Sequence, residues 1–218
     1  MTVENCWYKS VCALSDTCSE SCIRYLEMLS LLEKSNIPKN RWVPSSLSPD
    51  DCDYDAFCDL AAIKVDIAKF VADGENLYLF SEKTGNGKTS WAIKLMLRYF
   101  DTVWAGNGFR CRGLFVHVPT LLVKLKNFDN PDSVVEQWKT LLPTVDLVVW
   151  DDIASTNLSN YDHSQLLTYI DQRTLNKKSN IYTGNLRLSG IEKSLGVRLA
   201  SRVWNASSRI ELKGGDKR

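Results

Sequence analysis

Residues 76–92 read NLYLFSEKTGNGKTSWA, and this stretch decides the fold. The apolar run NLYLF is typical of a buried strand, and residues 88–100 have the apolar spacing of a largely buried helix. Between them lies a turn that contains Gly85 and Gly87 and ends in Gly-Lys-Thr. A strand, a glycine-containing turn and a helix that opens with Lys-Thr are the context in which such a turn binds phosphate. We therefore predict a phosphate-binding loop over residues 83–90.

The residue types in this loop suit phosphate chemistry. Gly85 and Gly87 let the backbone approach an anion closely and adopt positive φ. Lys88 would neutralise the β- and γ-phosphates, and Thr89 would offer its hydroxyl to Mg²⁺. The expected ATP-binding residues are Lys83, Thr84, Gly85, Asn86, Gly87, Lys88, Thr89 and Ser90. The alternative is an ordinary turn that caps a helix.

Glu82 departs from the usual pattern G-x-x-x-x-G-K-[ST], in which the first position is glycine. An acidic side chain that pointed at the phosphates would oppose nucleotide binding, whereas one that pointed away would not. The sequence leaves both orientations open, and with them the affinity of the loop.

A pair of acidic residues follows another apolar run, in LVVWDDIAS at 147–155. Asp151 would lie at the carboxyl end of a strand, where parallel sheets bind ligands, and would hold Mg²⁺ through water. Asp152 would be the general base that polarises the attacking water. Asn185 follows a further strand and would position this water if the two strands are neighbours. The alternatives are a solvated strand end and an ordinary turn.

Strand-like and helix-like segments alternate along the rest of the chain. Further strands are expected at 113–118, 145–150, 179–185 and 209–212. Helices are expected at 19–35, 55–73, 88–100, 120–127, 131–142 and 162–176, with a short one ending near Gly196 and another at about 197–204. This alternation predicts an α/β fold with a parallel sheet between helices.

Three sections are expected along the sequence. Residues 1–35 would form a small, cysteine-rich N-terminal domain with one helix. Residues 36–54 would form an extended linker, because three of the six prolines lie there. Residues 55–218 would form the nucleotide-binding domain.

The four cysteines near the start have the spacing C-x₅-C-x₅-C-x₃-C and are Cys6, Cys12, Cys18 and Cys22. Four thiolates can close a tetrahedral Zn²⁺ site, and a metal would supply the folding energy that so short a segment lacks. The alternative is that Cys22 is simply buried on the apolar stripe of a helix. His117 and His163 are each isolated in the sequence, and we expect structural roles for both.

The composition is that of a globular protein. Of 218 residues, 44% are hydrophobic and 24% are charged, so the chain can bury a core. The net charge of +1 gives no electrostatic argument for binding nucleic acid or a membrane. No apolar run reaches the roughly 18 residues that a membrane-spanning helix needs. We therefore expect a soluble, cytoplasmic protein without a membrane partner.

Taken together, these motifs resemble those of the AAA+ helicase loaders of the DnaC/DnaI type, particularly the versions encoded by phages and prophages of Gram-positive bacteria. The segments that carry the resemblance are CWYKSVC, NIPKNRW, NLYLFSEKTGNGKTSWA, GLFVHVPTLL, LVVWDDIAS, IYTGNL and LGVRLASRV. The resemblance implies an AAA+ P-loop NTPase core with ATP and Mg²⁺ as cofactors. It also implies a zinc-binding N-terminal domain that contacts a hexameric replicative DNA helicase, which the loader delivers onto single-stranded DNA in the bacterial host cytoplasm. Weak ATPase activity that partners stimulate, and self-association through the ATPase domain, are implied as well.

The same resemblance assigns roles to residues. Lys88 and Thr89 would belong to Walker A, Asp151 and Asp152 to Walker B, and Asn185 to sensor 1. Asp152 stands where the family usually has glutamate, so its side chain is shorter by one CH₂ group. The shorter side chain argues against fast hydrolysis more than it argues against nucleotide binding.

Arginines near the C-terminus also match the family. Arg198 or Arg202 resembles the arginine finger, which acts on ATP in a neighbouring subunit. The two are spaced i, i+4, so one helix face presents both. Arg218, the last residue, is similar in position to the sensor 2 arginine.

Two other functions remain open at this point. The chain could be a non-hydrolysing adaptor or inhibitor of the helicase that keeps the fold and only binds nucleotide. It could also be a transposition-type AAA+ ATPase, which shares the core but acts with a transposase. The cysteine-rich start favours a loader.

Overall fold

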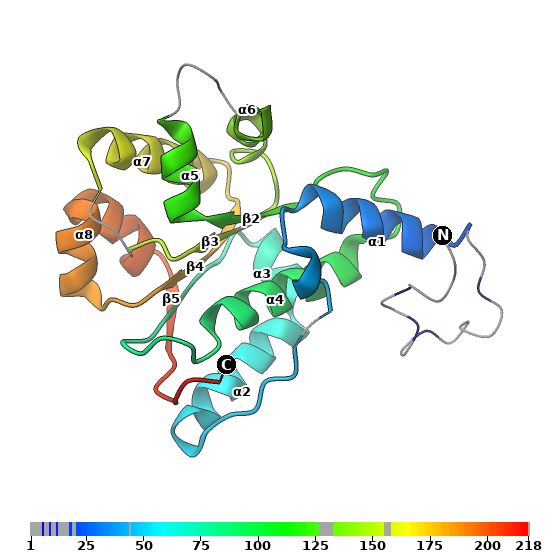
Figure 1. The fold of residues 1–218 in the computed structure, drawn as a ribbon, viewed down its shortest axis with the longest axis horizontal. Helices are drawn as coiled ribbons and strands as arrows, with labels where there is room; N and C mark the ends of the chain where they lie inside the picture. Colours follow the sequence, from blue (N-terminus) through cyan, green and yellow to red (C-terminus); the bar gives the residue numbers. More distant parts are fainter. Residues whose placement is uncertain are drawn as a thin grey trace.

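A parallel β-sheet between two layers of helices forms the core of the computed structural model (Figure 1). The structure describes residues 21–43, 45–126, 133–154 and 158–217, with Cys6, Lys9, Cys12 and Cys18 from the N-terminal segment. The strands are β1 (Asn76–Phe80), β2 (Gly113–His117), β3 (Leu147–Asp151), β4 (Ser179–Gly184) and β5 (Ser208–Glu211). They lie in the order β2-β3-β4-β1-β5 within the described residues, and every neighbouring pair is parallel. The predicted parallel sheet is confirmed.

The register brings three strand ends to one edge of the sheet. Phe80 at the end of β1 pairs with Gly184 at the end of β4. Trp150 in β3 pairs with Tyr182 in β4, and β1 and β3 are therefore the two neighbours of β4. Because parallel strands all end at the same edge, the loop after β1 and the acidic pair at the end of β3 emerge at one edge, on either side of the end of β4.

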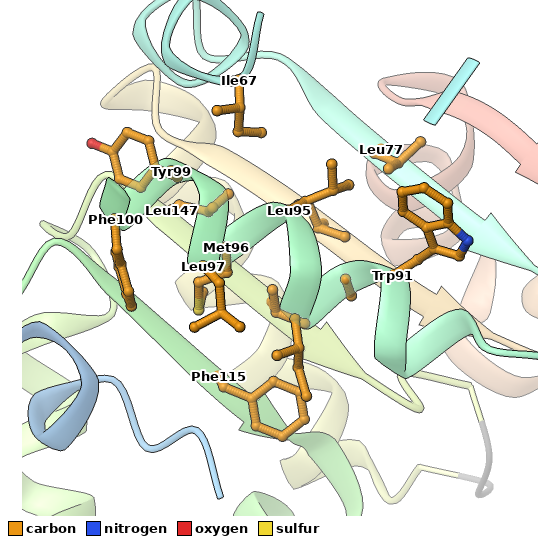
Figure 2. Packing of buried hydrophobic residues seen from close by; sticks show 14 of the residues in the cluster. Ile67, Leu77, Trp91, Leu95, Met96, Leu97, Tyr99, Phe100, Phe115 and Leu147 are labelled. Carbon is orange, nitrogen blue, oxygen red and sulfur yellow. The ribbon is translucent and has the colours of Figure 1, made fainter. Parts of the chain in front are cut away.

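One face of the sheet is covered by α1 (Ile23–Lys34), α2 (Tyr54–Val65), α3 (Ile67–Ala72) and α4 (Lys88–Val103). Alternate residues of a strand point to opposite faces, so Leu77 and Leu79 of β1 join this layer. Figure 2 shows the buried side of α4, where Trp91, Leu95 and Met96 pack near Leu77, Phe115 and Leu147.

The opposite face is covered by α5 (Val118–Leu125), α6 (Ser133–Leu141), α7 (Asn160–Leu175), α8 (Leu188–Ala200) and the π-helical turn η6 (Ser201–Asn205). Tyr78 and Phe80 of β1 point into this layer, with Trp150 of β3 and Tyr182 of β4. Both faces of the central strands are thus covered, and β1 and β3 contribute apolar side chains to both layers, as their continuous apolar runs predicted.

The helix boundaries differ from the predicted ones in a few places. The helix expected at 55–73 is divided at Asp66 into α2 and α3, and Gly74 follows with a φ of 71°, as a helix-ending glycine does. The break expected near Gly196 is present, because this residue has a φ of 75° and a ψ of 156° within α8. The linker 36–54 contains two short 3₁₀ turns, η4 (Lys39–Arg41) and η5 (Asp51–Asp53).

Helix α1 packs on the sheet rather than standing apart from it. Met28, Leu31 and Leu32 are buried in the same core as α4 and the strands, and Phe115 of β2 donates its backbone N–H to the carbonyl of Ser35 at 2.7 Å. The predicted division of the chain after residue 35 stays a prediction. Among the described residues, no helix combines the length and the apolar character needed to cross a bilayer.

Candidate nucleotide-binding site

A cavity of about 600 Å³ opens at the carboxyl edge of the sheet, above the loop that follows β1. Its lining comes from Arg41 and residues 45–47 of the linker, residues 84–90 of the loop and α4, Asp152, Asn185 and Lys217. All the predicted loop residues except Lys83 therefore line one cavity, together with two of the predicted catalytic residues. A cavity of this volume is in the range that holds small-molecule ligands.

The loop has the backbone geometry that its glycines make possible. Gly85 and Gly87 have φ values of 75° and 99°, in the region that residues with a β-carbon rarely adopt. Gly87 is the N-cap of α4, and its carbonyl accepts the backbone N–H of Trp91 at 2.8 Å. The N-terminus of this 16-residue helix therefore faces the cavity with its partial positive charge.

Lys88 is buried at the centre of the loop. Its ammonium group donates hydrogen bonds to the carbonyl of Lys83 at 2.9 Å and to Oδ1 of Asn86 at 3.2 Å. Both acceptors are uncharged, whereas a phosphate would place negative charge opposite the ammonium and offer it several acceptor oxygens. A phosphate in the cavity could therefore replace these contacts.

Two predicted loop residues hold the loop in place. Asn86 is fully buried, and its side-chain amide donates to the carbonyl of Leu212 at 3.1 Å and to the hydroxyl of Ser81. Lys83 donates its ammonium to the carbonyl of Lys213 at 2.9 Å. These contacts fasten the loop to the segment that follows β5.

Glu82 points away from the cavity. Its side chain is 68% exposed, and its carboxylate accepts a hydrogen bond from Nε of Arg187 at 2.9 Å. Arg187 also donates to Glu211 at the end of β5. The negative charge of Glu82 is thus paired outside the phosphate loop, which decides the orientation that the sequence left open.

Thr89, which lines the cavity, is hydrogen-bonded to Asp151 at the end of β3. The hydroxyls of Thr89 and Thr183 donate to Oδ1 of Asp151 at 2.8 and 2.7 Å. Burial raises the pKa of Asp151 above its ordinary value, and the two hydroxyl donors oppose this shift. Hydroxyl and carboxylate oxygens are the ligands that Mg²⁺ prefers, so the donor set fits this ion.

Asp152 occupies a tight turn directly after β3. Its φ of 58° is left-handed, a conformation that aspartate tolerates better than most residues, and its backbone N–H donates to the hydroxyl of Thr183 at 3.0 Å. Asn185 follows β4 and lines the same cavity. The Oδ1 atom of Asn185 is buried and has no hydrogen-bond partner among the described residues. A buried acceptor of this kind suits a site that binds a water molecule or a polar ligand.

Arg41 lines the cavity and His117 lies next to Asp152, although neither was predicted from the sequence to be a site residue. His117 pairs with Asp151 in the β2–β3 register, and its Nε2 lies 3.8 Å from Oδ2 of Asp152. His117 is isolated in the sequence, but its place at the end of a predicted strand brings it beside the acidic pair, and the structural role expected for it stays a prediction. Arg41 lies in the linker segment NIPKNRW and donates to the hydroxyl of Ser90 at 3.0 Å.

The two arginines predicted to act on a neighbouring subunit do not line the cavity. Arg198 and Arg202 are both exposed and share Asp171 of α7, with N–O distances of 3.4 and 2.8 Å. Arg218 lies outside the described residues. In the described part of the chain, the metal-ligand side chains that cluster are Asp50, Cys52 and Asp53, and His117, Asp151 and Asp152. Neither group includes Cys6, Cys12, Cys18 or Cys22, so the zinc site stays a prediction.

The sheet order, the glycine loop and the Thr89–Asp151 pair define an AAA+ type of P-loop nucleotide-binding protein. The family model described as "IstB-like ATP binding protein" matches residues 42–203, which is most of the chain. The protein therefore belongs to the IstB-like ATP-binding family.

Solved structures of similar fold include replication proteins. The DnaC helicase loader is 19% identical with a TM-score of 0.65, and the match covers 81% of this chain and 100% of that one. DnaI is 20% identical with a TM-score of 0.64 over 84% and 95% of the two chains. A primosome component assigned in Streptococcus pyogenes serotype M3 is 18% identical with a TM-score of 0.62 over 87% and 98%. Among curated proteins, no sequence matches the chain. The narrower likeness to phage and prophage versions stays a prediction.

Proposed function

We propose that the protein is an ATP-dependent loader that binds a hexameric replicative DNA helicase and delivers it onto single-stranded DNA. The observation that carries the nucleotide chemistry is that Lys88, Thr89, Asp152 and Asn185, from three separate segments, line one cavity. The similarity to DnaC and DnaI over nearly the full length of those chains supports the loader function.

The loop and α4 would hold the triphosphate of ATP. Backbone N–H groups at the start of α4 and the ammonium of Lys88 supply positive charge where phosphates would lie. Thr89 and Asp151 would hold Mg²⁺, directly and through water respectively. When bound, this ion would neutralise charge on the β- and γ-phosphates.

Asp152 and Asn185 would carry out hydrolysis. Asp152 would accept a proton from the attacking water, and the side-chain oxygen of Asn185 would orient that water. His117 lies next to this base, with its Nε2 atom 3.8 Å from Oδ2 of Asp152. Because aspartate reaches less far than glutamate, we expect slow turnover. Slow turnover suits a protein in which the nucleotide state acts as a switch.

The remaining roles depend on partners. Arg198 or Arg202 would reach the ATP of a neighbouring subunit, so full activity would require self-association, and Arg218 would act as the sensor 2 arginine. Residues 1–35 would bind Zn²⁺ through Cys6, Cys12, Cys18 and Cys22 and contact the helicase. The partner protein distinguishes the two candidate functions, because a transposition-type ATPase would bind a transposase instead of a helicase.

The experiment that tests the function measures ATP hydrolysis by the wild type and by Lys88→Ala, with and without single-stranded DNA and a replicative helicase. We expect slow turnover that the partners stimulate and that Lys88→Ala abolishes. Lys94→Ala is the matched control, because Lys94 is on the same helix, lies over the Trp91 ring and does not line the cavity. Helicase binding without nucleotide turnover under any condition would indicate an adaptor or inhibitor, and capture of a transposase instead of a helicase would indicate the transposition-type function.

A further inference from the structure

The segment that follows β5, residues 212–217, crosses the phosphate loop and is called the tail below. Leu212 continues the β1 pairing, because its backbone N–H donates to the carbonyl of Phe80 at 2.9 Å. Further along, the backbone N–H of Lys217 donates to the carbonyl of Gly85 at 2.9 Å. A β-carbon at Gly85 would lie only 2.1 Å from Oδ1 of Asp216. The tail therefore rests directly on a loop residue that lines the cavity.

Two aspartates before α2 hold the tail in this position. Asp53 is fully buried, and its two carboxylate oxygens accept the backbone N–H groups of Lys213 at 2.6 Å and Gly214 at 3.0 Å. Asp50 accepts the N–H of Gly215 at 2.9 Å. A β-carbon at Gly214 would come within 2.2 Å of Asp50 and 2.4 Å of Asp53, so only glycine fits there.

The side chain of Lys217 links this clamp to the cavity. Its ammonium donates to Oδ1 of Asp50 at 3.0 Å and to the carbonyl of Ser48 at 2.5 Å, and Lys217 itself lines the cavity that also holds Lys88. The Lys217 side chain is 19% exposed, and that of Asp50 is 46% exposed. The hydrogen bond from Lys217 is the largest cause that lowers the pKa of Asp50.

An ion pair with a half-exposed aspartate is a weak partner for an ammonium group. Solvent screens such pairs, and holding two flexible side chains together costs conformational entropy. A nucleotide phosphate carries more charge and several acceptor oxygens, so it competes well for the same ammonium. Asp50 would still be held by the backbone of Gly215 after Lys217 had left it.

We propose that Lys217 is a nucleotide-binding residue, which exchanges its ion pair with Asp50 for contact with the phosphates of a nucleotide in the cavity. This inference rests on the proposed function, since it assigns a residue to the same nucleotide site. Asp50 would compete with the nucleotide for the Lys217 ammonium. The tail and the linker would then respond together to nucleotide, because Asp50 joins them.

The test is a titration of the full chain with fluorescently labelled ADP and ATP in the presence of Mg²⁺. Lys217→Ala should weaken binding by about tenfold, the scale of one charge-assisted contact. Lys213→Ala is the matched control, because it removes the same charge from the same tail, while its side chain is exposed and does not line the cavity. Lys213→Ala should bind as the wild type does.

Asp50→Asn separates a nucleotide-binding role of Lys217 from a purely structural one, because the two predict opposite changes in nucleotide affinity. The asparagine keeps an acceptor for the N–H of Gly215 but removes the negative charge opposite Lys217. The ammonium then keeps neutral partners, the carbonyl of Ser48 and the ring of Phe57, so nucleotide binding should become about threefold tighter. If the tail acted only as a structural support, Asp50→Asn and Lys217→Ala would both weaken binding. Weaker binding by Asp50→Asn, or wild-type binding by Lys217→Ala, overturns the inference. Wild-type protein that binds no nucleotide overturns the proposed function and the inference together, whereas wild-type binding that Lys217→Ala leaves unchanged overturns the inference alone.

Discussion

Glu82 and Arg187 form an ion pair in which Nε of Arg187 lies 2.9 Å from Oε1 of Glu82, on the outer side of the phosphate loop. Glu82 takes the position that is glycine in the usual loop pattern, so its charge is the feature that most threatens phosphate binding. The ion pair directs the carboxylate away from the cavity, and Arg187 is shared with Glu211 of β5. The loop therefore tolerates glutamate at position 82, because Arg187, itself paired with Glu211 at the end of β5, binds its carboxylate on the outer side.

Glu82→Gln should leave nucleotide binding almost unchanged. Because both partners are largely exposed, the pair contributes no more than about 1 kcal/mol to stability, and the dissociation constant should shift by less than about twofold. Titration with labelled nucleotide at low and at moderate salt measures this. A gain in affinity of tenfold or more, lost at higher salt, would mean that the carboxylate faces the phosphates.

Asp151→Asn should stabilise the ligand-free protein at neutral pH while removing its response to Mg²⁺. Burial raises the pKa of Asp151, so the folded state binds this proton more tightly than the unfolded state does. The charged form therefore costs stability at pH values above the ordinary aspartate pKa of about 3.9, and the cost disappears below it. Asparagine keeps an oxygen that can accept from Thr89 and Thr183.

Thermal unfolding at roughly pH 3 to 8, a range that includes the ordinary aspartate pKa, measures the stabilisation of the ligand-free protein. The gain in Tm of Asp151→Asn over the wild type should shrink to zero at the acid end. Nucleotide titrations with Mg²⁺ and with EDTA measure the second effect, and an intact Mg²⁺ response in Asp151→Asn would contradict the assignment.

Asp152→Asn should abolish ATP turnover and leave nucleotide affinity within about threefold, because the general base acts only on the attacking water. Asp152→Glu restores the longer side chain and should raise turnover. Its gain is limited because residue 152 has a φ of 58°, which glutamate adopts less readily than aspartate. Single-turnover hydrolysis measures the chemical step separately from binding. If Asp152→Asn hydrolysed ATP at the wild-type rate, another residue would be the general base.

The fold could be predicted well because each central strand is buried on both faces. Continuous apolar runs such as LVVW mark such strands clearly, and the alternation with helices predicts parallel pairing. The division of the helix at Asp66 was missed, since aspartate is compatible with a helix and neither glycine nor proline marks the break. The neighbouring positions of β3 and β4 were assumed in the prediction for Asn185, and the register confirms that the strands pair.

The site was predictable only where a short motif encodes it. Lys88 and Thr89 follow from the loop, and Asp151 follows from the end of an apolar strand. Asp53 and the backbone of Lys213 lie 160 positions apart in the sequence, and their contact depends on how β5 returns beside β1. Such contacts are set by tertiary packing, and single-sequence patterns carry no signal for them.

Arg173→Met should destabilise the fold without altering the cavity. The guanidinium is fully buried at the opposite edge of the sheet and donates to Oδ1 of Asn180 and to the carbonyls of Leu142, Val145 and Ser179, at 2.5–2.9 Å. Burial lowers the pKa of this arginine. Removing the donors leaves several buried acceptors unpaired, which should lower the free energy of unfolding by about 3–5 kcal/mol.

Urea unfolding followed by circular dichroism measures that loss. Arg98→Met is the control, because Arg98 is 41% exposed and its ion pair is with Asp101 one turn along the same helix. Where Arg173→Met remains folded, it should bind nucleotide as the wild type does, and a loss of stability below about 1 kcal/mol would show that the acceptors find other donors.

Arg198 is the better candidate of the two arginines for action on a neighbouring subunit. Its side chain is 69% exposed and reaches Asp171 at 3.4 Å, whereas Arg202 is 44% exposed and is held at 2.8 Å. A guanidinium that stabilises transition-state charge raises turnover by about 10³-fold or more. Arg198→Ala should therefore lose turnover and keep nucleotide binding, and Arg202→Ala should lose much less.

Mixing two inactive variants tests whether the arginine acts between subunits. Lys88→Ala cannot hold ATP but still presents Arg198, while Arg198→Ala holds ATP but lacks the arginine. Equal amounts of the two should regain ATPase activity that neither shows alone, because some interfaces join an intact pocket to an intact Arg198. A mixture of Lys88→Ala with Asp152→Asn should regain none, because the nucleotide pocket is defective in every subunit. Loss of activity in Arg198→Ala without recovery in the first mixture would place the arginine's action within its own chain.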